Sequence, residues 1–266
     1  MTRRSTKFSA LSTAAAALAL TLGLATGSGA SADEADARNL LEAMSDYLAA
    51  QMVISFDYDR ILEIVTDEQQ KLALASSGTV TVSRPDKIRA TRAAGFADVE
   101  MLFDGETLTL LGKLANLYTQ IEVPGTLDHL IDELREKYKS PLPGADLLLS
   151  NIYEELMVDV VDVKDLGSGV IGDVECDHLA FRTDEVDWQI WIAHGDHPYP
   201  CLYIITSRAI TGAPQYSIHV RDWKTGDAVA VEDFTFTNST NAEYVEIVDM
   251  TGHHDLPEHV EAGDNQ

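Results

Sequence analysis

Apolar residues recur at every third or fourth position between residues 33 and 52, a spacing that predicts an amphipathic helix. From residue 53 to residue 123 apolar and polar positions alternate instead, which predicts β-strands that each bury one face. Turn signals divide this stretch, because Pro85 cannot donate to a strand ladder and Asp104-Gly105 suits a tight hairpin turn. The connections are short, so an antiparallel meander of about six strands is the simplest topology.

The alternation stops at Pro124-Gly125, and Thr126 is a candidate N-cap for a helix. A second helix is expected from Asp146 to about Leu156, again from the spacing of apolar residues. Strands then return, and the glycine-rich segment 167–172 is interpreted as a flexible loop between two of them. These later strands are expected at residues 157–164, 174–183, 187–193, 200–208, 216–220 and 229–236, with residues 244–248 as a candidate for one more.

Together the elements predict an α+β fold, an incomplete antiparallel β-barrel of about 11–12 strands. A sheet of this size cannot stay flat, so one face becomes concave. The N-terminal helix and the helical insertion at about 126–156 would then cover the concave face as a lid. Because both surfaces are apolar, they would enclose a hydrophobic cavity.

The first 32 residues have the layout of a cleavable signal peptide. Arg3, Arg4 and Lys7 precede an apolar run, which ends in small residues and an Ala-x-Ala site. The run is short for a membrane span, so a retained anchor is the less favoured alternative. The general secretory route is favoured over a twin-arginine route. We therefore expect one periplasmic domain over residues 33–248, without an integral membrane segment after cleavage, and a disordered acidic tail at 249–266.

The whole chain has a net charge of −25, and removal of the leader makes it more acidic still. Such a charge repels phosphates, so it argues against nucleic acid as a partner and disfavours docking on an anionic membrane surface. A solvated acidic surface that keeps the protein soluble is the simplest interpretation.

Catalytic and cofactor motifs give little support for an enzyme. Residues 167–172 match the dinucleotide fingerprint G-x-G-x-x-G, but a strand-like segment follows them where a helix would have to receive the pyrophosphate. His194 and His197 flank an aspartate in a polar turn, where three ligands rarely converge on one metal. Cys176 and His178 share a strand face, which is more typical of ordinary strand residues than of a catalytic pair. We expect no cofactor and no metal.

Cys176 and Cys201 are the only cysteines of the chain. In a meander both lie near the same end of the sheet with one strand between them, about 9–10 Å apart. A disulfide needs Cα atoms closer than about 7 Å. The bond is therefore expected only if the strand at 187–193 ends early, and it would be structural because no C-x-x-C is present.

A family resemblance is carried by residues 78–89, 103–108, 142–148, 176–182, 187–192 and 212–216. These segments resemble the LolA/LolB superfamily of periplasmic lipoprotein carriers, and more closely a family of predicted periplasmic proteins of unknown function within it. The resemblance covers roughly residues 35–240 and implies a half-barrel with a helical lid, acyl-chain binding and no catalysis. The arginine by which the LolA carrier ties its lid to the barrel has no evident counterpart here, so lipoprotein shuttling is not inferred.

Large apolar residues on the strands and on the first lid helix are the candidate ligand contacts, with packing in an ordinary core as the alternative. Trp188 and Trp191 are three positions apart in a strand and face opposite sides, so at most one of them lines a cavity. The candidate ligand-binding residues are Met101, Phe103, Leu127, Leu130, Ile131, Leu134, Tyr138, Trp188 and Tyr203.

The favoured hypothesis is a non-enzymatic periplasmic protein that carries or senses a lipid or another hydrophobic molecule. An alternative is a sensor or chaperone-like module that binds an envelope protein with its concave surface. A hydrolase without a recognisable motif is a third, weaker hypothesis.

Overall fold

The computed structural model of the protein describes residues 29–138 and 143–247. Within these residues one sheet contains all the strands, in the order β12-β6-β5-β4-β3-β2-β1-β11-β10-β9-β8-β7. The strands are β1 (Val53–Val65), β2 (Lys71–Ser83), β3 (Lys87–Ala93), β4 (Asp98–Phe103), β5 (Thr107–Gly112), β6 (Leu117–Glu122), β7 (Asp162–Ile171), β8 (Val174–Arg182), β9 (Val186–Ala193), β10 (Pro200–Ser207), β11 (Gln215–Thr225) and β12 (Glu243–Tyr244).

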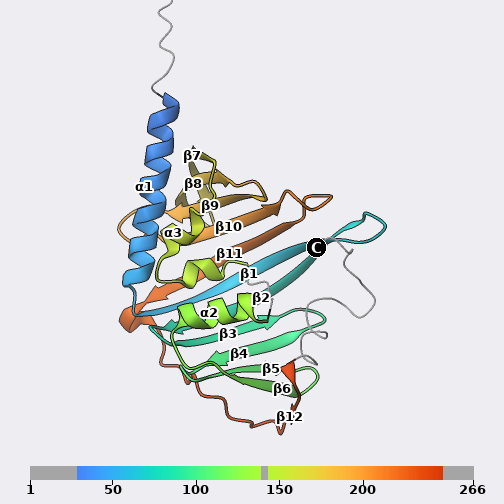
Figure 1. The fold of residues 1–266 in the computed structure, drawn as a ribbon. Coiled ribbons are helices and arrows are strands. Elements are labelled where there is room, and N and C mark those ends of the chain that lie inside the picture. The colour runs from blue at the N-terminus through green and yellow to red at the C-terminus, as the bar shows by residue number, and fades with distance from the viewer. Residues whose placement is uncertain (1–28, 139–142, 248–266) are drawn as a thin grey trace, which may run out of the picture.

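Each half of the chain forms an antiparallel meander, and the two halves join where β1 pairs with β11. The edge strands β7 and β12 do not pair with each other, so the described sheet is an open barrel. The predicted α+β fold, an incomplete antiparallel barrel, is therefore confirmed. Figure 1 shows the helices on one side of the fanned sheet. They are α1 (Gly29–Ala50), α2 (Leu127–Glu136) and α3 (Ile152–Leu156), with short 3₁₀ helices η1 (Ala145–Leu148) and η2 (Gly226–Ala228).

Two apolar clusters form the core between the helices and the sheet. One lies beneath α1, η1 and α3 and includes Leu41 and Met44. The other lies beneath α2 and includes Leu130 and Phe103. The N-cap expected at Thr126 is present, because its side chain accepts a hydrogen bond from the backbone N–H of His129.

The second lid helix differs from its prediction. Instead of one helix from Asp146, the chain forms η1, an extended residue at Leu149 and then α3. The cause is a competing donor: the Arg84 guanidinium donates to the carbonyl oxygens of Leu148 and Leu149, which a continuous helix would use internally. Asp128 also accepts the backbone N–H of Ser150 at 2.7 Å.

The glycine-rich segment 167–172 is not a loop. β7 runs through it to Ile171, with a bulge between Asp165 and Ser168 that Gly167 relieves at φ +81°. The turn to β8 is formed by Gly172 and Asp173, which both have positive φ. The expected start of this strand at residue 157 was also wrong, because β7 begins at Asp162.

The strand expected at 229–236 is absent from the structure. β11 already pairs with β10 on one side and with β1 on the other, so the chain that follows it finds no free edge there. It crosses instead to the far edge, where Glu243 and Tyr244 pair parallel to β6. Val231 is fully exposed on the way. The predicted tail at 249–266 and residues 1–28 of the predicted leader lie outside the described residues.

Candidate functional site

An apolar cavity of about 210 Å³ lies where the two core clusters meet. Its floor comes from the concave face of the sheet and its roof from the lid segment around η1 and from α1. The lining residues are Leu48, Phe56, Tyr58, Arg60, Val80, Ile88, Ala90, Met101, Pro143, Gly144, Ala145, Leu147, Leu148, Pro200, Tyr216, Ile218, Val220 and Trp223.

Strand register places the floor residues side by side. Phe56 pairs with Val80, Val80 with Ala90, and Ala90 with Met101, so a row of apolar side chains crosses β1 to β4. Because side chains alternate along a strand, Tyr58 and Arg60 lie on the same face as Phe56.

The roof is held by the turn between β2 and β3. Arg84 Nη1 donates to Leu148 O at 2.8 Å, and Pro85 O accepts the backbone N–H of Leu127, which begins α2. Arg84 Nε is buried and has no partner among the described residues. Burial lowers the pKa of Arg84, and the negative charge of Asp128 opposes this effect. Arg84 thus connects the barrel to the lid segment, a contact that sequence reasoning missed.

One end of the cavity is polar. Arg60 Nε donates to Ser76 Oγ at 3.1 Å, and its guanidinium carbon lies 5.8 Å from the centre of the Tyr216 ring. The Tyr58 hydroxyl donates to Thr91 O at 2.8 Å. Burial raises the pKa of Tyr58, and it raises the pKa of Tyr216 to about 12, so both phenols are neutral at physiological pH.

The other end is aromatic. The Trp223 ring stacks between Phe56 and Tyr199, with ring centroids 5.5 Å and 5.2 Å away. Trp223 reaches the concave face because of a register shift between β1 and β11, where Asp222 has a positive φ of 52°. Its indole Nε1 is buried without a partner among the described residues.

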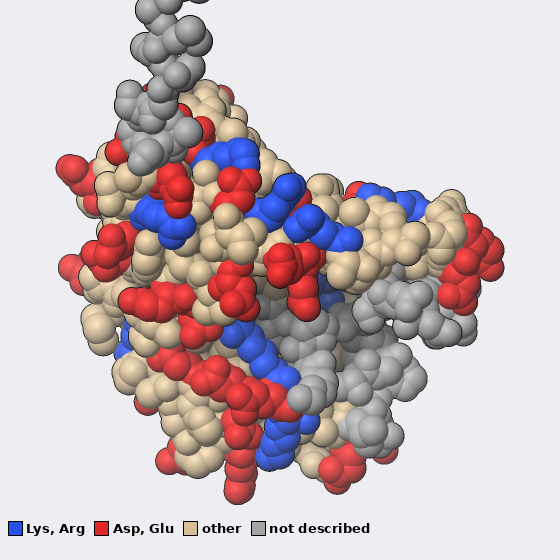
Figure 2. Space-filling model, turned by 45° about the horizontal axis from the view of Figure 1, so that its top comes forward, with Lys and Arg blue, Asp and Glu red and all other residues tan. Residues whose placement is uncertain are grey.

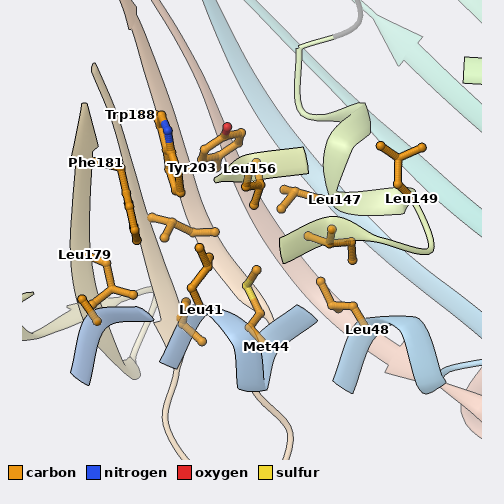
Figure 3. Close-up of a cluster of buried hydrophobic side chains, with 14 of the residues drawn as sticks. Leu41, Met44, Leu48, Leu147, Leu149, Leu156, Leu179, Phe181, Trp188 and Tyr203 are labelled. Atoms are coloured by element: carbon orange, nitrogen blue, oxygen red, sulfur yellow. The ribbon is translucent and has the colours of Figure 1, made fainter. Parts of the chain in front are cut away.

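The residues predicted from the sequence to contact a ligand divide into two groups. Met101 lines the cavity. The others pack in the core clusters, where Phe181, Trp188 and Tyr203 form an aromatic group beside Leu41 and Met44 (Figure 3). The core members are Phe103, Leu127, Leu130, Ile131, Leu134, Trp188 and Tyr203, with Tyr138 partly buried against them.

The strongest site features that sequence reasoning missed are Arg60, Tyr216 and Trp223. Arg60 carried a usable signal, because a cation four positions after Phe56 and two after Tyr58 falls on the buried face of an alternating strand. Tyr216 was recognised only as a strand residue. Trp223 had no such signal, since the bulge reverses its face.

Cys176 and Cys201 do come together, although not in the expected way. β9 runs to Ala193, which pairs with Cys176, so the strand does not end early. The two Sγ atoms lie 2.9 Å apart. The pairing of β9 with β10 shifts its register at Cys201, and the small side chain of Ala193 packs with both cysteines. Both thiols are free and buried in the structure.

The polar turn at residues 194–197 forms surface contacts. His194 Nε2 lies 2.6 Å from Asp177 Oδ1, and the His197 ring contacts Tyr47. Within the described residues, no group of three or more His, Cys, Asp or Glu side chains is arranged to hold a metal ion.

Residues 37–248 match the family model described as "Predicted periplasmic protein (DUF2092)". The chain belongs to this family. The family recognised from the sequence is therefore confirmed, and with it the periplasmic location. None of the described helices is long and apolar enough to cross a membrane.

Solved structures with a similar fold share little sequence with the DUF2092 chain. LprF from Mycobacterium bovis is 12% identical with a TM-score of 0.47, over 76% of this chain and 98% of that one. A chain of the MucA/MucB complex from Pseudomonas aeruginosa is 14% identical with a TM-score of 0.44, and the match covers 76% of this chain and 61% of that one. A LolA superfamily protein from Nitrosomonas europaea is 12% identical with a TM-score of 0.35, and the match covers 75% of this chain and 97% of that one. No functionally curated protein matches the chain.

Proposed function

We propose that this DUF2092 protein is a non-enzymatic periplasmic binding protein that carries or senses a lipid or another hydrophobic molecule in the cavity between sheet and lid. The observation that supports the proposal best is the apolar cavity of about 210 Å³. A dry apolar cavity of about 150 Å³ is already large enough to bind a small aromatic molecule.

The chemistry of the lining favours an apolar ligand over water. Phe56, Ile88 and Met101 offer no hydrogen bonds, so water molecules in their midst would lack partners. A ligand that covers these side chains gains about 25 cal/mol for each Å² of apolar surface removed from water. Groups that could orient the ligand are confined to the two ends of the cavity, at Arg60 and Trp223.

The direct test is organic extraction and mass spectrometry of the mature protein, purified from its own periplasm without detergent. We expect a stoichiometric lipid or other hydrophobic molecule. A protein without an extractable ligand that instead retains an envelope polypeptide would favour the alternative of a protein-binding sensor.

A pair of matched variants locates the ligand. Ala90→Phe fills the cavity from β3, whereas Ala73→Phe places the same side chain on an exposed position of β2. We expect the first variant to lose about tenfold or more of the bound ligand, because the cavity space is occupied, and the second to retain it. Equal retention in both variants would contradict this location.

A further inference from the structure

Arg60 is the only charged side chain that lines the cavity among the described residues. It stands at the opposite end from Trp223. Along β1, Phe56, Tyr58 and Arg60 cover about 13 Å at the rise of a strand, so the apolar row leads directly to the guanidinium.

Arg60 also differs from most of the described arginines in lacking a carboxylate partner. Arg89 pairs with Glu100, Arg182 with Asp187, and Arg221 with Asp59. Arg60 forms no ion pair with any described residue, and its hydrogen-bond partners, the hydroxyls of Ser76 and Tyr216, are both neutral. This is unexpected in a chain with 44 acidic and only 19 basic residues, whose surface is widely acidic (Figure 2).

A cation without an anionic partner at the end of an apolar cavity has lost hydration that no opposite charge replaces. Arg60 is half-buried, and its guanidinium faces the Tyr216 ring, where it has lost part of its hydration. An anion placed beside it would recover that loss through charge-assisted hydrogen bonds, which the guanidinium offers as a planar fork that matches carboxylate and phosphate oxygens. Neutral Tyr58 and Tyr216 hydroxyls at the same end add no competing charge.

On the basis of the proposed function, we infer that the ligand is an anionic amphiphile, whose apolar chain fills the cavity and whose carboxylate or phosphate head group binds Arg60. A single chain suits the row of side chains from Phe56 to Arg60. Fatty acids and single-chain phospholipids share this chemistry.

The experiment compares probes with one chain length and different head groups. The mature protein, stripped of ligand, is titrated calorimetrically with dodecanoate, dodecyl phosphate, dodecanol and dodecyltrimethylammonium, each below its critical micelle concentration. We expect the two anions to bind about tenfold or more tightly than dodecanol, as one charge-assisted hydrogen bond provides. Dodecyltrimethylammonium should bind more weakly than dodecanol.

Arg60→Gln should remove the preference for anions while leaving the affinity for dodecanol unchanged, and Arg60→Lys should keep part of it. Arg221→Gln is the matched control, because it removes the same charge from the opposite face of the adjacent strand. Circular dichroism of each variant verifies folding. Retention of the anion preference in Arg60→Lys keeps the test valid if Arg60→Gln fails to fold.

The outcomes separate the two proposals. Equal binding of dodecanoate and dodecanol, or an anion preference that persists in Arg60→Gln, overturns the head-group inference and leaves the cavity proposal intact. Failure of every probe to bind overturns the proposed function itself. A preference for dodecanoate over dodecyl phosphate that depends on Arg60 supports a fatty acid, and the reverse order supports a phosphate-bearing lipid.

Discussion

Replacement of Arg84 by alanine should loosen the roof of the cavity without unfolding the barrel. Arg84 Nη1 donates to Leu148 O at 2.8 Å, a good hydrogen bond, and Nη2 reaches Leu149 O at 3.5 Å, the limit of one. A hydrogen bond to a charged group contributes about 1.5–3 kcal/mol. Removing the partly buried guanidinium returns part of its desolvation penalty, the same penalty that lowers the pKa of Arg84.

The net loss is therefore about 1.5 kcal/mol, which corresponds to about a tenfold larger population of the open roof. Hydrogen exchange measured by mass spectrometry should show faster exchange of amides between residues 145 and 156, with α1 little changed. Arg182→Ala, which breaks an exposed ion pair with Asp187, is the control and should leave exchange in the roof unaltered. Unchanged exchange at residues 145–156, or an equal acceleration throughout the sheet, would refute the assignment of Arg84 as a local clamp.

Three further results are expected. Leu41→Ala, at a fully buried position of α1, should lower the free energy of unfolding by about 2–5 kcal/mol in urea denaturation, and a loss below about 1 kcal/mol would contradict the packing described. Burial raises the thiol pKa of both Cys176 and Cys201, so a thiol reagent should modify the native protein about tenfold or more slowly than the unfolded one, and faster as pH rises. If no thiol reacts after unfolding without reductant, Cys176 and Cys201 are joined by a disulfide in the isolated protein. Hydrogen bonds from Arg182 lower the pKa of Asp187. This carboxylate therefore stabilises the fold fully above the ordinary aspartate pKa of about 4, and the stabilisation is lost as pH falls through the lowered pKa of Asp187 in the folded protein. The urea midpoint of Asp187→Asn should therefore fall below that of the wild type at pH 7 and converge with it in acid, and a difference that persists in acid would exclude this linkage.

Much of the fold was readable from the sequence because its periodicity is a local property. β3 lies within the alternating stretch from 53 to 123 that predicted strands, and Thr126 caps α2, since alternation and capping depend on near neighbours. The strand expected at 229–236 did not form for the opposite reason: a strand needs a free edge to pair with, and both edges of β11 are occupied by β10 and β1.

The face on which a side chain lies was predictable only where the ladder is regular. Trp188 is buried in the core, whereas Trp191 stacks on His178 on the other face of the sheet. Two residues three positions apart in a strand must face opposite sides in this way. At the register shifts of β10 and β11 this rule fails. There Cys201 approaches Cys176 and Trp223 joins the cavity, and bulges of this kind leave no mark in the apolar pattern.

What the sequence by itself determined is the family, the alternating half-barrel and the set of apolar residues that lie between sheet and helices. Only the tertiary structure decided which of them touch each other and which border empty space. Leu130 and Met101 are equally apolar in sequence, yet Leu130 fills the core while Met101 lines the cavity. The reason is that a cavity forms where two packed surfaces do not fit each other completely. Its position depends on where the lid lies on the sheet, which Arg84 helps to fix and which neither surface determines alone.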